Sequence, residues 1–223
     1  MAKALDLDEQ EQLDQIKHFW NTWGNLISWL LIVVLGSYAA WNGYQYWERS
    51  QAAKAAALYD EVERAVGSGD LARVERSLAD MKEKFGRTQF AQQSALLAAK
   101  TLQAQGKSEA AREALIWVVS GAKDPAYRDI ARLRLVALQL EAKAYDEALK
   151  QLGSDFTPEM AGLAADLRGD VLQAKGQSAD AVTAYQQAWN KLVDTPDYRR
   201  LVQAKLNALG IDPDAAAVSE TPK

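Results

Sequence analysis

The sequence contains no cysteine and a single histidine, His18. Without thiols the chain forms neither a disulfide nor a thiolate metal site, and one imidazole cannot by itself assemble a metal site or a nucleophilic triad. Runs rich in lysine and arginine are missing as well, so the chain has no cluster of positive charge to bind the phosphates of a nucleic acid. These absences predict a protein with no catalytic site, no metal or cofactor and no nucleic-acid partner.

Carboxylate pairs are the remaining candidates for chemistry. Asp166 and Asp170 lie one helical turn apart and could serve acid–base catalysis, but charges at this spacing more often form a solvated helix face. The segment Gly67-Ser68-Gly69 lacks the preceding strand, the lysine and the length of a phosphate-binding loop, so it predicts a turn. The composition therefore favours a protein that binds other polypeptides and is not an enzyme.

Acidic and basic side chains are also missing from one long segment near the N-terminus. Between His18 and Trp47 no Asp, Glu, Lys or Arg occurs, and Leu26 to Leu35 reads LISWLLIVVL. About 20 mostly apolar residues cross a bilayer as a helix. Aromatic residues flank the apolar centre, as expected of rings at the two membrane interfaces: Phe19, Trp20, Trp23, Trp41, Tyr44, Tyr46 and Trp47. The sequence predicts a transmembrane helix with aromatic belts over residues 18–47, after a short acidic N-terminus at residues 1–17.

Two alternatives to a membrane anchor are a cleaved signal peptide and a buried core helix. The long acidic segment before the apolar run disfavours the first, and the aromatic belts disfavour the second. Lysine and arginine are balanced at the two ends, so the positive-inside rule gives no orientation. Small residues four positions apart form a candidate face for contact with another transmembrane helix: Gly36, Ala39, Ala40 and Gly43.

An internal repeat follows the apolar segment. Four short stretches align, namely GDLARV at 69–74, GKSEAA at 106–111, KAYDEA at 143–148 and GQSADA at 176–181. Their steps of 37, 37 and 33 residues are close to the helix-turn-helix period of tetratricopeptide repeats, about 34. Glycine at each turn permits a left-handed backbone, and Lys143 is the exception. The predicted fold is all-α, with a single N-terminal transmembrane helix followed by a tetratricopeptide-like α-solenoid over residues 48–209.

Capping signals divide this domain into helices. Asp124, Thr157 and Thr195 each precede a proline suited to the first helical position, and Ser108 and Ser178 are predicted to cap second helices. The predicted helices are 70–85, 88–105, 108–121, 125–142, 145–152, 158–175, 178–193 and 196–208. The helix after the membrane segment is expected to continue the transmembrane helix and to form the first half of the first pair. The last helix would cap the array, and residues 210–223 are predicted to form a disordered tail.

The first helices of such pairs line a concave surface that can hold an extended peptide or a partner helix. Carrying the groove positions of tetratricopeptide repeats onto this register gives these candidates: Gln93, Lys100, Gln103, Leu133, Glu141, Asp166, Asp170 and Gln173. The competing interpretation is that they are simply exposed helical residues. Because lysines and arginines do not cluster among them, a clamp for an acidic C-terminus is disfavoured.

Several stretches resemble the YfgM family: IKHFWNTWGN before the membrane segment, QYWERSQ after it, then RLRLVALQL, AADLRGDVLQAKGQSADAVTAYQQAW and QAKLNAL. The resemblance implies an ancillary, non-enzymatic subunit of the bacterial SecYEG translocon. It further implies a single-pass inner-membrane protein with a cytoplasmic N-terminus and a periplasmic repeat domain. Implied partners are the membrane-anchored chaperone PpiD and emerging polypeptides, which would be transferred to periplasmic chaperones. The alternative function is a membrane-tethered scaffold for another envelope assembly process, such as division or cytochrome assembly.

Overall fold

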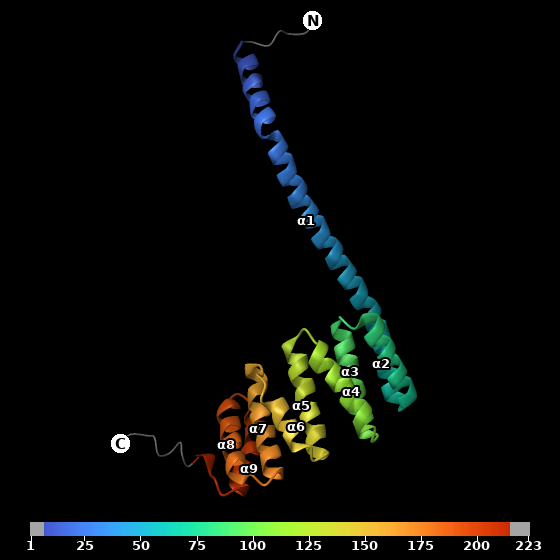
Figure 1. Ribbon diagram of the computed structural model, residues 1–223, viewed down its shortest axis with the longest axis vertical. Coiled ribbons are helices and arrows are strands. Elements are labelled where there is room, and N and C mark those ends of the chain that lie inside the picture. The colour runs from blue at the N-terminus through green and yellow to red at the C-terminus, as the bar shows by residue number, and fades with distance from the viewer. Residues whose placement is uncertain (1–6, 215–223) are drawn as a thin grey trace, which may run out of the picture. The chain divides into compact units, whose positions relative to one another are not determined.

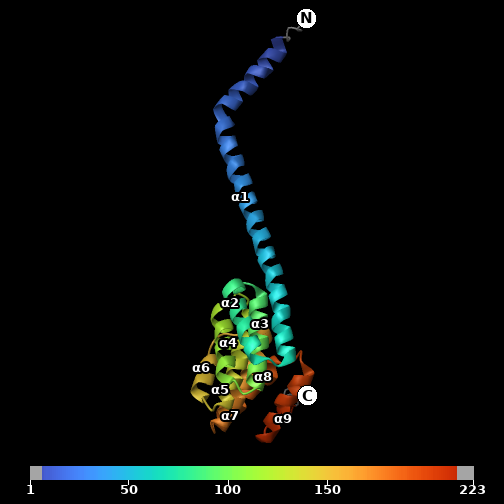
Figure 2. The same ribbon diagram turned by 90° about the vertical axis from the view of Figure 1, so that its right-hand side faces the viewer.

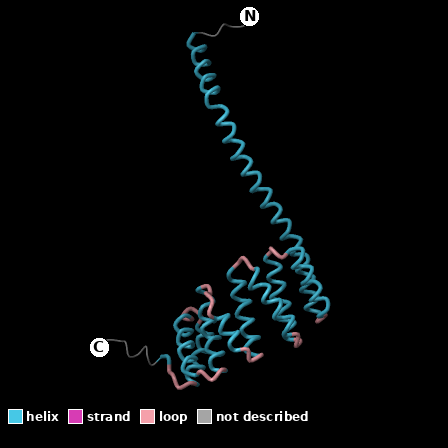
Figure 3. Tube along the Cα trace, viewed as in Figure 1, coloured by secondary structure: helices cyan, strands magenta, loops and turns pink. Residues whose placement is uncertain are grey.

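The computed structural model describes residues 7–214, and their side chains from residue 13 onward. Within that range the chain forms helices and no strand (Figures 1 and 3). The helices are α1 (Leu7–Ser68), α2 (Leu71–Phe85), α3 (Gln89–Ala104), α4 (Ser108–Gly121), α5 (Pro125–Glu141), α6 (Tyr145–Leu152), α7 (Pro158–Ala174), α8 (Ser178–Lys191) and α9 (Pro196–Ala208). The chain divides into two compact units, Met1–Gln51 and Ala52–Lys223. The predicted all-α fold is confirmed.

The first unit holds the apolar part of α1. In the described residues, α1 is the one helix that is long and apolar enough to cross a membrane. Large hydrophobic side chains from Leu13 to Trp47 stand exposed around it, which excludes a buried core helix. Because α1 begins at Leu7, part of the predicted N-terminal segment is helical, and residues 1–6 lie outside the described residues. Figure 2 shows that α1 bends in its N-terminal part.

The second unit is an array of antiparallel helix pairs. Residues 52–68 of α1 pair with α2, and the pairs α3–α4, α5–α6 and α7–α8 follow in chain order before α9 closes the array (Figure 1). The predicted ranges agree with these helices to within two residues at every end. Residues 7–68 are helical without interruption, as expected for the segment that follows the apolar run.

Each pair turns on a residue with left-handed backbone. The positive φ angles are 69° at Gly69, 76° at Gly106, 58° at Lys143 and 83° at Gly176. At each turn the next residue donates its backbone N–H to a carbonyl five residues earlier, as in a Schellman motif, over 2.8 to 3.2 Å. The exception noted in the sequence, Lys143, therefore adopts the same backbone as the glycines. Gly210, 34 residues after Gly176, repeats the motif with φ 79°, so α9 ends like the first helix of a further pair.

The helix starts follow only part of the capping prediction. Asp124 caps α5 as predicted, because its carboxylate accepts a backbone N–H of the first turn. The carboxylate of Asp70 caps α2 in the same way. Thr157 and Thr195 make no side-chain cap, so that prediction was wrong. The Thr195 hydroxyl instead donates to the Leu192 carbonyl at 3.1 Å. Ser108 and Ser178 are the first helical residues and not the caps, because each of these helices begins one residue earlier than a serine cap would require.

Four overlapping apolar clusters form the core of the second unit. One cluster joins α1, α2 and α3, a larger one joins α1 through α5, a third joins α5, α6 and α7, and the last joins α7, α8 and α9. Burying each leucine or valine stabilises the fold by about 1.5–3 kcal/mol. Since every cluster connects neighbouring helices, stability is shared along the array as in other repeat proteins.

The residues after α9 belong partly to the fold. Gln203 donates to the Asp214 carboxylate at 2.6 Å, and Ile211 packs against the last apolar cluster. Residues 210–214 thus turn back onto α9, although they were predicted to belong to the tail. Residues 215–223 of the predicted tail lie outside the described residues.

Candidate functional site

The first helices of successive pairs contact one another directly. α3 touches α5 and α5 packs against α7, so these helices form one continuous face of the array. We call this the inner face and define it by the exposed and half-buried residues of α3, α5 and α7. In helix-pair repeats this face is the curved surface that binds partners. All eight candidate groove residues are on these three helices.

Polar side chains bridge α3 and α5 across the inner face. The Gln93 amide donates to the Tyr127 hydroxyl at 2.6 Å, and the Arg134 guanidinium donates to the Leu96 carbonyl at 2.9 Å. These contacts fix the spacing of the two helices, and they leave the Gln93 side chain half-buried. Tyr127 and Arg134 were not among the predicted residues. The spacing of the repeats predicts which residues lie on the same face, but it does not predict which side chains form hydrogen bonds between neighbouring helices.

Two predicted residues meet at the end of α3 and α5. The Gln103 amide donates to both carboxylate oxygens of Glu141 at 3.2 Å. Lys100 on α3 and Gln173 on α7 are exposed, and Leu133 is half-buried against the α5–α7 cluster. The inner face therefore presents polar side chains that can form hydrogen bonds with a partner, beside a partly exposed leucine.

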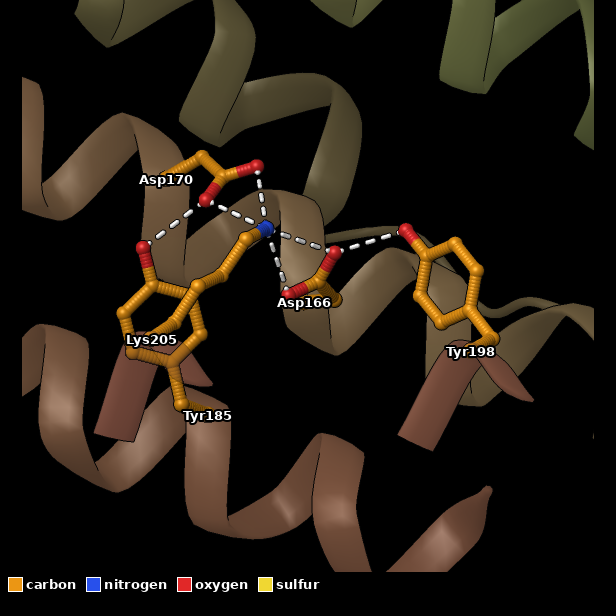
Figure 4. A network of polar contacts seen from close by, with 5 residues as sticks. All are labelled: Asp166, Asp170, Tyr185, Tyr198 and Lys205. Atoms are coloured by element: carbon orange, nitrogen blue, oxygen red, sulfur yellow. Dashed lines mark hydrogen bonds and ion pairs between the residues drawn. The ribbon is translucent and has the colours of Figure 1, made fainter. Parts of the chain in front are cut away.

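Asp166 and Asp170 have a different environment (Figure 4). The Lys205 ammonium of α9 lies 2.8 Å from Asp166 Oδ1 and 2.7 Å from Asp170 Oδ1. Tyr198 of α9 donates to Asp166 at 2.7 Å, and Tyr185 of α8 donates to Asp170 at 2.8 Å. Asp166 is 1% exposed. The interpretation of this pair as a solvated face was wrong for Asp166, because α9 covers it.

We call these five residues the α9 latch. Burial raises the pKa of Tyr185 and of Tyr198, and their hydrogen bonds to Asp170 and Asp166 raise these pKa values further. Both phenols therefore stay protonated and serve as donors over the physiological pH range. The latch gives every carboxylate oxygen at its centre a donor or a cation, which is what a buried charge requires.

The latch is a contact that holds α9 on α7. Both of its carboxylates are bound by the ammonium group of Lys205 from the same chain. Within residues 13–214 no group of three His, Cys, Asp or Glu side chains is placed to hold a metal ion. In the sequence, the latch is indicated only by the two aspartates four residues apart. Its cation, Lys205, is about 35 residues further along the chain, so the local spacing does not predict it.

The predicted membrane-helix contact face lies in the first unit. Gly36, Ala39, Ala40 and Gly43 are all exposed on α1. A Cβ added at Gly36 or at Gly43 would meet no atom within 4 Å. The backbone of α1 is therefore open to close approach along this face, as small residues in membrane helices permit.

Comparison with known proteins identifies the family. A family model described as a tetratricopeptide repeat-like domain matches residues 17–211. A protein of Neisseria gonorrhoeae (strain ATCC 700825 / FA 1090), named ancillary SecYEG translocon subunit, is 33% identical over 92% of this chain and 99% of its own length. The chain belongs to the YfgM family. YfgM-family relatives with that same name are 26% identical in Haemophilus influenzae, over 83% of this chain and 90% of theirs, and 27% identical in Escherichia coli, over 92% and 98%.

Membership of the YfgM family covers both units described above. The family model begins at the start of the apolar segment and ends just after the Gly210 turn, so the anchor and the complete array are included. No solved structure matches the chain. The inner face and the α9 latch of this YfgM-family chain are therefore known from its own structure.

Proposed function

We propose that this protein is an ancillary, non-enzymatic subunit of the SecYEG translocon in the bacterial inner membrane. The observation that carries the proposal is the match over nearly the whole chain to proteins named for that role. A membrane helix and a binding array fit the role, because it requires a position beside a channel and a surface for polypeptides, and no reactive group.

The proposed topology places the N-terminus in the cytoplasm and the repeat array in the periplasm. The YfgM resemblance supports this orientation, whereas the balanced lysines and arginines do not favour either one. A C-terminal alkaline phosphatase fusion tests it in a bacterial host. We expect an active fusion, since the enzyme matures only outside the cytoplasm, and an inactive but stable fusion would overturn the topology.

The inner face is the proposed binding surface for emerging polypeptides and for the chaperone PpiD, with handover of clients to periplasmic chaperones as the result. Exposed Lys100 and Gln173 and half-buried Leu133 offer mixed polar and apolar contacts to an extended chain. Asp166 and Asp170 delimit this surface through their bonds to α9 and are not free for a partner.

Photocrosslinking tests this surface residue by residue. A probe at Lys100 or at Gln173 should crosslink to translocating polypeptide or to a chaperone in intact membranes. The matched control is a probe at Gln187, which is exposed on the second helix α8. Equal crosslinking from all three positions would contradict a role for the inner face.

Co-purification in mild detergent tests the assembly. The tagged full-length protein should bring down SecYEG subunits and PpiD, and recovery of neither would refute the proposal. Partners from division or cytochrome assembly would instead support the tethered scaffold.

We expect Gly36→Leu to weaken recovery of a membrane partner by blocking close helix approach. Leu31→Phe, on the opposite face of α1, is the control that should leave recovery unchanged.

A further inference from the structure

A hollow of about 550 Å³ adjoins α1 at the end of the apolar segment. Its lining consists of five side chains, Trp41, Asn42, Gln45, Tyr46 and Arg49. All five belong to the first unit, Met1–Gln51. The lining therefore belongs to α1 alone and shares no residue with the inner face.

The five lining residues share one face of the helix. Trp41, Gln45 and Arg49 are four residues apart, and so are Asn42 and Tyr46, which places them on adjacent rows of a helix with 3.6 residues per turn. Gln45 is nine residues, or two and a half turns, from Gly36. The row of Trp41, Gln45 and Arg49 thus lies opposite Gly36, whereas Tyr46, seven residues from Ala39, borders the small-residue face.

Every side chain of the lining carries a hydrogen-bond donor. The donors are the Trp41 indole, two amides, the Tyr46 hydroxyl and the Arg49 guanidinium, and the lining contains no carboxylate. No ion pair among the described residues involves Arg49. A phosphodiester complements such a surface, because it presents acceptor oxygens and one negative charge that a guanidinium binds with two parallel bonds.

The position along the helix matches the headgroup layer. Arg49 is the first basic residue after the apolar segment, and tryptophan and tyrosine beside it are the residue types found at the membrane interface. We propose that this hollow is a headgroup site for an anionic glycerophospholipid, with the phosphate on Arg49 and the glycerol hydroxyls on Asn42 and Gln45. A zwitterionic amine headgroup fits less well, because no carboxylate of the lining receives its ammonium.

Binding of defined lipids to the full-length protein in detergent tests the site. Native mass spectrometry with phosphatidylglycerol should show retained lipid, and Arg49→Gln should weaken its binding about fivefold, the effect of one basic residue near an anionic surface. Lys54→Gln is the matched control, since it removes an exposed positive charge outside the lining and should leave binding unchanged. Equal losses in both variants would overturn the site in favour of general charge attraction.

A second pair of measurements separates a built site from charge alone. Asn42→Leu with Gln45→Leu keeps Arg49 but removes both amides, and it should also reduce phosphatidylglycerol retention. Equal retention of phosphatidylethanolamine by the unaltered protein, or a photoprobe at Gln45 that crosslinks to a protein and not to lipid, would overturn the proposal. The inference rests on membrane insertion of α1, and protease protection of each variant checks that insertion separately. The translocon pull-down tests the proposed function and does not depend on lipid binding.

Discussion

Gly169 in α7 faces the ring of Tyr185 in α8, and a Cβ added at Gly169 would overlap that ring. A buried ring in a close-packed interface has little room to move aside. Helix propensity alone would favour alanine over glycine at this position by about 1 kcal/mol. The close packing of Tyr185 opposes that preference, because it leaves no room for the alanine methyl group.

We predict that Gly169→Ala lowers the free energy of unfolding by about 1–3 kcal/mol, as overpacking of a core does. The control is Gly67→Ala in α1, where an added Cβ meets nothing within 4 Å and helix propensity should stabilise the protein. Thermal unfolding of the full-length protein in mild detergent, followed by circular dichroism, measures both. Stabilisation by Gly169→Ala would show that the Tyr185 ring can shift freely.

Lys143 is the one non-glycine residue with positive φ in the described chain. A left-handed backbone costs an ordinary residue roughly 1–2 kcal/mol, which glycine avoids. Lys143→Gly should therefore raise the apparent melting temperature by a few degrees, the shift expected for about 1 kcal/mol in a domain of this size. Lys143→Ala retains the Cβ and should give no such gain. A gain of equal size from alanine would point to the lysine charge and not to the backbone.

The element that depends most on side-chain chemistry is α9. It is held on α8 by Arg199, whose guanidinium lies 3.6 Å from the Trp189 ring centre, and on α7 by the latch. Because Asp166 is buried, loss of Lys205 would leave its charge without a cation. Breaking a buried pair from one side typically costs 3–5 kcal/mol.

Lys205→Met should therefore lower the free energy of unfolding by about 3–5 kcal/mol. Lys107→Met is the matched control, because Lys107 also makes a 2.8 Å ion pair, with Glu75, but both side chains are 43% exposed. That variant should change stability by less than about 1 kcal/mol. Hydrogen exchange localises the effect, which we expect in α9 first; equal losses in the two variants would contradict a buried latch.

Stability at alkaline pH follows from the latch tyrosines. Because the folded-state pKa values of Tyr185 and Tyr198 are raised, folding favours the protonated phenols. Their contribution is complete below the ordinary tyrosine pKa of about 10 and declines as the pH rises above it.

We predict a steep loss of melting temperature above about pH 10, and tyrosinate absorbance in which Tyr185 and Tyr198 titrate late, together with Tyr59, whose pKa is also raised by burial. Replacing Tyr185 and Tyr198 with phenylalanine should reduce the amplitude of the late step in the absorbance titration. If every tyrosine titrates near its ordinary pKa in the folded protein, the burial of these phenols is refuted.

At the scale of the whole molecule, exposed apolar surface is concentrated in the first unit. Within residues 52–214 the exposed large hydrophobic side chains are Ile116, Val193 and Leu201, whereas residues 13–47 expose most of theirs. The four core clusters lie within the second unit. The second unit thus has the features of an independently folding domain.

A fragment of residues 48–223 should therefore be soluble without detergent and unfold cooperatively. Size-exclusion chromatography and thermal unfolding measure this, with the full-length protein in detergent as the reference for the array. Aggregation of the fragment would show that the array needs the membrane segment for stability.

The sequence by itself determined the elements and their order. Runs of apolar residues, proline positions and the repeated turn are local signals, and they were enough for the membrane segment, the helix ranges and the family. Local patterns did not predict the helix caps at the threonines and serines correctly, because these hydroxyl groups can form hydrogen bonds with several different partners.

Only the tertiary structure decided which of the candidate groove residues are free to contact a partner. Asp166 and Lys100 occupy equivalent kinds of position in the sequence, yet one is buried beneath α9 and the other is exposed. The difference arises from Lys205 and Tyr198, which are more than 30 residues from Asp166 in the chain. Helical periodicity specifies the face on which a residue lies, whereas its burial and charge partners depend on the next helix, which packs there only once the array has formed.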